Sequence, residues 1–277
     1  MVPDSLRAEV IHSHLQPRVI RCAMIDFDGT VSLLREGWDQ VMIPMMVEEL
    51  QSLPGTTETT EQLAGKVTDW VVKLNGQPTI KQMQALVDEV SIRRGTPQPA
   101  GVYKQRYLQR LSNMIEKRKQ DVRNSGMPSR WTVPGTHHML DQLKRRQLPL
   151  LLASGTDLDA LREEAAILQV DHYFTEGIAG PESDTSTFTK AGSCDAMLSR
   201  LQAGGSSLLN IGDGYVETKV TKERGGLAIG VAYDHDHPGE YHGWRREQLI
   251  KAGVDLIVPD LQQSDLLLRW LLDESAA

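Results

Sequence analysis

Short apolar segments alternate with longer amphipathic ones along most of this chain. Continuous apolar runs of strand length occupy residues 19–25, 148–153, 207–211, 227–232 and 255–258. Helical patterns lie between these runs, and such an alternation is typical of a Rossmann-like parallel sheet with helices on both faces. Unbroken apolarity indicates strands that are buried on both sides. We also expect a further short strand within residues 172–180 and an edge strand within residues 8–14.

The stretch from residue 36 to residue 130 follows a different pattern and has no strand signal. Its apolar residues recur at helical spacing, as Leu63 and Val67 do, and as Tyr107 and Leu111 do, so we expect these side chains to form the core between the helices. Three breaks separate the helical segments, at residues 53–55, 75–78 and 95–99. The pattern therefore predicts an all-helical domain, residues 36–130, inserted into an α/β core made of residues 1–35 and 131–277.

Composition and charge exclude several classes of function. The chain has 277 residues, of which 40% are hydrophobic and 24% charged, as in ordinary soluble proteins. A net charge of −7 disfavours binding to nucleic acid or to an anionic membrane. The sequence shows no signal peptide and no run of the roughly 18 apolar residues that a membrane span needs. Two cysteines are too few for a disulfide framework. We expect a cytoplasmic protein, a monomer or homodimer, with no membrane or nucleic-acid partner.

Two acidic residues come directly after the first predicted core strand, in the segment Asp26-Phe27-Asp28-Gly29-Thr30. Residues two apart on a strand point to the same side, so both carboxylates can face one site. Like charges this close are costly unless a cation joins them or one carboxyl keeps its proton. A Mg²⁺ site explains the pair, since Mg²⁺ takes carboxylate and phosphate oxygens as ligands. Taken alone, the segment is equally typical of a turn capped by its acids.

Three later segments favour the metal site over the plain turn. Ser154-Gly155 and Asp213 follow further predicted strands, Glu217 comes four residues after Asp213, and Lys190 lies in a loop that enters a helical segment. In an open α/β sheet, ligands bind beyond the carboxyl ends of the strands. We therefore expect these residues to meet at one edge, where a divalent ion and Lys190 would balance the acids.

Each of these residues has a chemical task in phosphoryl transfer. Asp26 can attack as a nucleophile and form an aspartyl-phosphate, while Asp28 can act as general acid and then as general base. Lys190 can neutralise charge on the phosphoryl group. The hydroxyl of Ser154 and backbone amides that include those of Gly155 and Thr30 can bind phosphoryl oxygens. For the metal, Mg²⁺, the candidate ligands are Asp26, Asp28, Asp213 and Glu217.

In their order and spacing, these motifs resemble those of haloacid dehalogenase superfamily phosphatases. The resemblance is to the subgroup with a helical cap after the first motif, which includes phosphoglycolate phosphatases and β-phosphoglucomutases. The family pattern is Asp-x-Asp-x-Thr, then Ser or Thr after the second strand, a Lys, and an acidic pair near Gly-Asp. The matching positions are Asp26, Asp28, Thr30, Ser154, Lys190, Asp213 and Glu217. Glu217 departs from the pattern, because the family more often has Asp there. Asp28 argues against dehalogenation, because the dehalogenases lack this second acid.

The resemblance also implies how the cap takes part. Caps of this subgroup reach the site with the loop between their second and third helices, here residues 75–79. Asn75, Gln77 and Thr79 offer hydrogen-bonding side chains for a substrate there, although a plain helix–helix turn explains them equally well. Arg35, at the entry to the cap, could clamp an anionic substrate group. Lys73 and Lys81 flank the loop, and a cap lysine would be needed for a phosphonate-cleaving enzyme.

The sequence therefore predicts a Mg²⁺-dependent phosphomonoester hydrolase. Its substrate would be a small phosphorylated metabolite, of the sugar phosphate or phosphoglycolate type. A sugar-phosphate mutase of the same superfamily is the first alternative, because it shares both acids of the first motif. A non-catalytic protein that binds a phosphorylated ligand is the second alternative.

Overall fold

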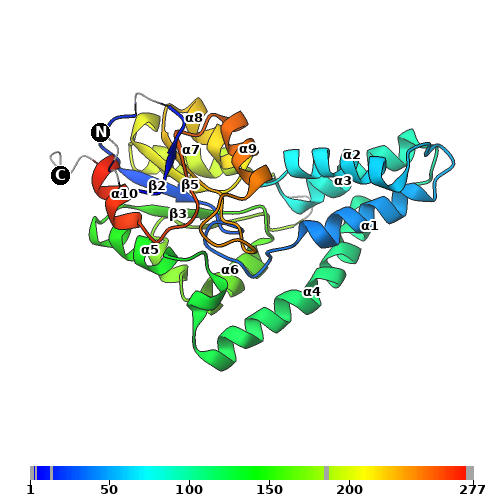
Figure 1. The fold of residues 1–277 in the computed structure, drawn as a ribbon, viewed down its shortest axis with the longest axis horizontal. Helices are drawn as coiled ribbons and strands as arrows, with labels where there is room; N and C mark the ends of the chain where they lie inside the picture. The colour runs from blue at the N-terminus through cyan, green and yellow to red at the C-terminus, as the bar shows by residue number, and fades with distance from the viewer. Residues whose placement is uncertain (1–2, 4, 13–14, 184–186, 273–277) are drawn as a thin grey trace.

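A seven-stranded sheet forms the centre of the molecule, with strand order β1-β7-β6-β5-β2-β3-β4 (Figure 1). The computed structural model describes residues 3, 5–12, 15–183 and 187–272. The strands are β1 (Glu9–Val10), β2 (Cys22–Ile25), β3 (Leu150–Ala153), β4 (Gly177–Ala179), β5 (Leu208–Gly212), β6 (Leu227–Val231) and β7 (Leu256–Val258). All neighbours pair in parallel except β1, which runs antiparallel to β7. β2 lies inside the sheet, flanked by β3 and β5.

Helices cover both faces of this sheet, as the sequence predicts. One face packs against α5 (Thr136–Arg145), α6 (Leu158–Ile167) and α10 (Ser264–Leu271). The other face packs against α7 (Lys190–Arg200), α8 (Tyr215–Glu223) and α9 (Gly243–Ala252). Every residue of β2, β3, β5, β6 and β7 is buried, which explains why these strands read as continuous apolar runs.

Four helices between β2 and β3 project from the core as a separate layer (Figure 1). They are α1 (Asp39–Gln51), α2 (Thr60–Lys73), α3 (Thr79–Ile92) and α4 (Ala100–Ser125). Their apolar faces form a cluster of their own, which includes Met46, Leu63, Leu86 and Tyr103. We call these four helices the cap. Since the cap buries its own apolar surface, it does not depend on the sheet for a core.

The observed elements confirm the predicted fold class: a mostly parallel sheet with helices on both faces and a helical insertion after the first core strand. The three predicted breaks all fall between cap helices. The edge strand is shorter than expected, with β1 limited to Glu9–Val10, and part of the predicted segment, residues 13–14, lies outside the described residues. The domain boundaries at 35/36 and 130/131 stay predictions. No helix in the described part of the chain is both long enough and apolar enough to cross a membrane.

Candidate active site

The carboxyl ends of three adjacent strands bring the predicted residues to one edge of the sheet. Asp26 follows β2, Ser154 follows β3 and Asp213 follows β5. β2 pairs with both of its neighbours in parallel, so the three strand ends point the same way. We call this edge the core rim. It is the position at which open α/β sheets bind their ligands.

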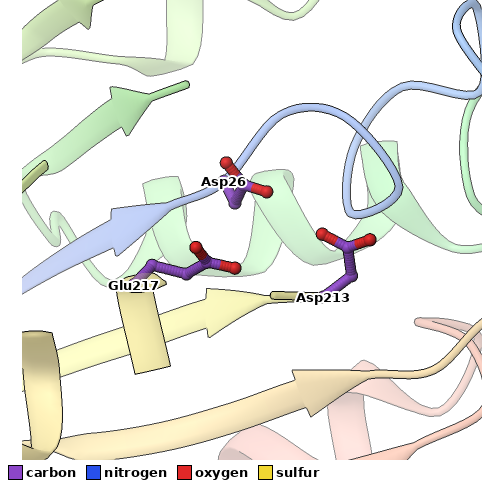
Figure 2. A group of neighbouring side chains, drawn as sticks. All are labelled: Asp26, Asp213 and Glu217. Atoms are coloured by element: carbon purple, nitrogen blue, oxygen red, sulfur yellow. The ribbon is translucent and has the colours of Figure 1, made fainter. Parts of the chain in front are cut away.

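Three carboxylates converge at the core rim (Figure 2). Asp26, Asp213 and Glu217 each offer an oxygen, and these oxygens all lie within 4.8 Å of one another. All three side chains are buried. Buried carboxylates this close repel one another unless cations or protons compensate them. The oxygen donors, their spacing and their excess charge fit a hard divalent cation such as Mg²⁺.

Lys190 lies within this acidic group. It is the first residue of α7, which begins there because the Thr189 side chain accepts a hydrogen bond from the amide of Gly192. Its Nζ donates to Asp26 Oδ1 at 2.5 Å and to Glu217 Oε2 at 2.8 Å. Burial works to lower the pKa of Lys190, but the two carboxylates outweigh it and the net shift is upward. Lys190 is therefore a permanent positive charge against Asp26.

Glu217 has a structural role as well as a place in the acidic group. It lies in the first turn of α8, where its Oε1 accepts a hydrogen bond from the amide of Gly214 at 2.5 Å. Its Oε2 is bound by Lys190. Both oxygens therefore already have donors, and the longer Glu side chain suits this double task. Metal binding by Glu217, either directly or through a water molecule, stays a prediction.

Asp213 is held in place from two sides. Arg245, fully buried on α9, has its Nε 3.2 Å from Asp213 Oδ2 and donates through Nη2 to Glu36 at 2.7 Å. Gly29 lies against the same carboxylate, where any Cβ would clash with it, and its φ of +79° also favours glycine. Burial raises the pKa of Asp213 to about 7 and also raises that of Asp26. Without a metal, the acidic group therefore tends to hold protons.

Asp28 points to different partners from Asp26. Its Oδ2 accepts hydrogen bonds from the hydroxyls of Ser154 at 3.0 Å and Thr156 at 2.8 Å. Its Oδ1 lies 3.7 Å from Arg35 Nε and has no hydrogen-bond partner in the described part of the chain. The acidic group found among the described residues does not include Asp28. A direct role of its side chain in metal binding stays a prediction.

Arg35 forms a salt bridge with Glu164 of the α/β core. Its Nε and Nη2 donate to the two oxygens of Glu164 at 3.1 and 2.6 Å. Glu164 lies on α6, its side chain is 1% exposed, and burial raises its pKa. This paired, two-bond geometry fixes the guanidinium beside Asp28. The prediction that Arg35 clamps an anionic substrate group remains untested, and the geometry shows that Glu164 already satisfies its charge.

The cap closes over the core rim and leaves a small cavity between them. The lining residues are Asp26, Asp28, Arg35, Trp38, Met42, Asn75, Gly76, Gln77, Thr79, Gln82, Tyr107, Ser154, Gly155 and Thr156. As the resemblance implies, the loop between α2 and α3 forms part of its wall. This loop passes so near Gly155 that a Cβ there would clash with the backbone oxygen of Gln77. Neither Lys73 nor Lys81 lines the cavity, so the structure offers no support for phosphonate cleavage.

Comparison with known proteins identifies this architecture. No protein-family model and no curated protein sequence matches the chain. Solved structures do match. A predicted phosphatase from Clostridium acetobutylicum is similar over 91% of this chain and 100% of its own, at 16% identity and a TM-score of 0.59. A β-phosphoglucomutase from Clostridium difficile is similar over 88% and 93%, at 14% identity and a TM-score of 0.58.

A third match names the fold. It is a haloacid dehalogenase-like protein of unknown function from Agrobacterium tumefaciens, similar over 90% of this chain and 98% of its own, at 14% identity and a TM-score of 0.58. This chain has the haloacid dehalogenase-like fold with a helical cap. The fold occurs in proteins described as phosphatases and as mutases, so it does not by itself decide the reaction.

Within this haloacid dehalogenase-like fold, the structure brings together all the predicted site residues except Thr30. Thr30 is fully buried, does not line the cavity, and its hydroxyl has no partner among the described residues. Its predicted contact with phosphate stays a prediction.

Sequence reasoning missed four residues that shape the site, namely Glu164, Arg245, Tyr107 and Gln82. Glu164 carried a signal, because it is an acid between Leu161 and Ala165 on the apolar face of a helix. Tyr107 was assigned to the cap core, and it does pack there while also lining the cavity. Arg245 and Gln82 carried no signal in the sequence.

Proposed function

We propose that this protein is a Mg²⁺-dependent phosphomonoester hydrolase that acts on a small phosphorylated metabolite through an aspartyl-phosphate. The observation that supports it most is the contrast between two carboxylates at the end of one strand. Asp26 is buried against Lys190 and the acidic group, whereas Asp28 is held by two hydroxyls and has one oxygen unbonded. Carboxyl groups in different environments take different roles in acid–base and nucleophilic chemistry.

In the first step, a carboxylate oxygen of Asp26 attacks the phosphorus atom. The new bond joins Asp26 to phosphorus, and the bond from phosphorus to the ester oxygen breaks. Asp28 gives its proton to the departing oxygen, so that the product leaves as a neutral alcohol. The hydroxyls of Ser154 and Thr156 hold Asp28 in place for this transfer.

In the second step, the same acid works in reverse. Asp28, now ionised, takes a proton from a water molecule, whose oxygen attacks the phosphorus atom of the aspartyl-phosphate. The bond between Asp26 and phosphorus breaks, which frees inorganic phosphate and restores the Asp26 carboxylate. The overall reaction consumes one water molecule and leaves both acids as they began.

Positive charge at the core rim makes attack by one anion on another feasible. Lys190 contacts Asp26 directly, so it can offset charge on the nucleophile and on the phosphoryl group. Asp26, Asp213 and Glu217 would hold Mg²⁺, which when bound would stabilise charge on the phosphoryl oxygens and orient them. Cap residues line one side of the cavity, and any bulk water that they exclude would strengthen these interactions.

The test is phosphate release from a panel of phosphorylated metabolites, with and without Mg²⁺, for wild type and Asp26→Asn. We expect release that needs Mg²⁺ and that the substitution abolishes. Asp236→Asn, in an exposed loop far along the chain, is the matched control and should behave as wild type. If Asp26→Asn keeps near-wild-type turnover, or if chelation of divalent ions has no effect, the proposal is wrong.

Product analysis separates the hydrolase from the two alternatives. A mutase would return an isomer of a hexose phosphate instead of free phosphate, although it would use the same two acids. A non-catalytic protein would bind phosphorylated compounds but would form neither free phosphate nor an isomer. Incubation with a hexose 1-phosphate, followed by assays for both phosphate and isomer, therefore decides among the three.

A further inference from the structure

The cap side of the cavity carries neutral polar groups that have no partner. The side chains of Asn75, Gln77 and Thr79, and the hydroxyl of Tyr107, make no hydrogen bond to any described residue. Gln82 donates through Nε2 to the backbone oxygen of Val71, and its Oε1 has no donor in the described part of the chain. Polar groups left unbonded in a confined cavity are costly, unless a ligand or water satisfies them.

The same wall has an apolar surface beside these groups. Trp38 and Met42, at the start of the cap, line the cavity together with the ring of Tyr107. Burial raises the pKa of the Tyr107 phenol, so it stays protonated and can donate a hydrogen bond. Hydroxyl-binding groups next to an aromatic and aliphatic surface suit a ligand with hydroxyls on its edge and C–H groups on its face.

The wall lacks a free positive charge. Among the described residues that line the cavity, Arg35 is the one cation, and Glu164 binds it with two hydrogen bonds. Asp28 lies on its other side and adds negative charge. A second anionic group on the substrate would therefore enter this space without a counter-ion, close to a carboxylate. Burying an unpaired charge in this way is strongly unfavourable.

We propose that the cap selects a phosphomonoester whose alcohol part is neutral and polyhydroxylated, and rejects substrates that carry a carboxylate or a second phosphate. This inference rests on the proposed hydrolase function. It narrows the expected substrates from small phosphorylated metabolites in general to those with a neutral alcohol part. It favours sugar or polyol monophosphates over phosphoglycolate. It also disfavours a mutase that works through a bisphosphate, because that intermediate needs a second anion site.

Matched pairs of substrates test the inference. A hexose 6-phosphate is compared with the corresponding aldonic acid 6-phosphate and with the hexose 1,6-bisphosphate, and 2-hydroxyethyl phosphate is compared with phosphoglycolate. We expect kcat/KM to be at least about tenfold higher for the neutral member of each pair. Equal values, or a preference for the charged member, would overturn the inference.

A generic aryl phosphate keeps this outcome separate from the proposed function. If p-nitrophenyl phosphate is hydrolysed in a Mg²⁺- and Asp26-dependent way but no neutral substrate is preferred, the proposed hydrolase function is supported and the proposed substrate class is wrong. If no compound is hydrolysed, including the aryl phosphate, the hydrolase itself is wrong and the substrate class falls with it.

Two pairs of variants locate the selectivity on the cap. Thr79→Lys places a free cation in the wall and should shift the ratio of kcat/KM toward the charged member by about tenfold. Thr57→Lys, an exposed cap position outside the cavity, should leave the ratio unchanged. Tyr107→Phe should raise KM for the neutral member by about tenfold, and Tyr241→Phe, at a half-buried position that does not line the cavity, should not. An unchanged ratio in Thr79→Lys, with the variant folded, contradicts the inference.

Discussion

The two sides of the cavity use polar residues in opposite ways. At the core rim the side chains are charged and bound to one another, as in the pairs Lys190–Asp26 and Arg245–Asp213. On the cap side they are neutral, and Asn75 and Thr79 have no partner among the described residues. Fixed charges suit a reaction that is the same for every phosphate ester. Unbonded neutral groups suit recognition of the part of the substrate that varies.

Replacing Asp28 should have the largest effect, because it tests whether the charged residues of the core rim carry out the reaction. We expect Asp28→Asn to lower kcat for an alkyl phosphate by about a thousandfold, because the departing alkoxide needs a proton. The loss should be much smaller for p-nitrophenyl phosphate, whose leaving group needs no proton. Steady-state phosphate release for the two substrates measures this. Equal losses for both would show that Asp28 is not the general acid.

Neighbouring arginines on α9 test whether charge pairing at the rim holds the fold together. Arg245 is buried between Asp213 and Glu36, whereas Arg246 pairs with Glu9 at the surface. Arg245→Met leaves the buried carboxylate of Asp213 and the partly buried carboxylate of Glu36 without their cation, and should lower the free energy of unfolding by about 3 kcal/mol. Arg246→Met should cost far less, because water screens that pair. Chemical denaturation of both variants gives the comparison, and equal losses would refute the role of Arg245.

The effect of pH on stability tests the charge balance of the acidic group. Burial raises the pKa of Asp213 from 3.8 to about 7, so without metal the folded state holds more protons than the unfolded state between these values. The free energy of unfolding contributed by this group therefore falls as pH rises through that window. Mg²⁺ must displace those protons, so its stabilising effect should grow with pH.

Thermal melts with and without Mg²⁺, at about pH 5.5 and about pH 7.5, measure this dependence. The rise in Tm on adding Mg²⁺ should be larger at the higher pH. Asp213→Asn should remove most of the Mg²⁺ effect at both values. A rise that is the same at both pH values in the wild type would mean that the acidic group does not bind the ion.

The smallest expected effect concerns the contact between the two sides. Gly155→Ala places a methyl group against the backbone of Gln77 and should push the cap loop away from the rim. We expect KM to rise by about tenfold, with little change in the free energy of unfolding. Gly65→Ala, on the open surface of α2, should leave KM unchanged and raise the free energy of unfolding by about 0.5–1 kcal/mol. An unchanged KM in Gly155→Ala would show that the cap loop does not need this contact.

The cap shows how far helical periodicity can go without a structure. The spacing of apolar residues and the three breaks predicted consecutive helical segments, and the three breaks fall between the four cap helices of the structure. Periodicity assigned Tyr107 to the cap core, where it packs, but could not show that Tyr107 also faces the cavity. A helical pattern gives the buried face of each helix, while the partner of that face depends on how the helices pack together.

The core rim was predictable for a different reason. Asp26, Ser154 and Asp213 each follow an apolar strand, and the carboxyl ends of parallel strands share one edge, so local sequence placed them together. Lys190 and Glu217 were proposed from the order of the motifs and from the family pattern, and the structure places both in the first turn of a helix. The side chain of Asp28 was expected beside Asp26, but it turns toward Ser154 and Thr156.

The sequence alone determined the α/β core, the helical insertion and the candidate nucleophile, acid and lysine, because each rests on short-range patterns or on strand ends. Only the tertiary structure decided which charges are already satisfied. Arg35 meets Glu164 across 129 residues of chain, and Arg245 meets Glu36 across 209. Such pairings depend on how distant helices pack on the sheet, and no local pattern encodes them. For that reason a chemistry for the site could be proposed from the sequence, while the neutral character of its cap wall required the fold.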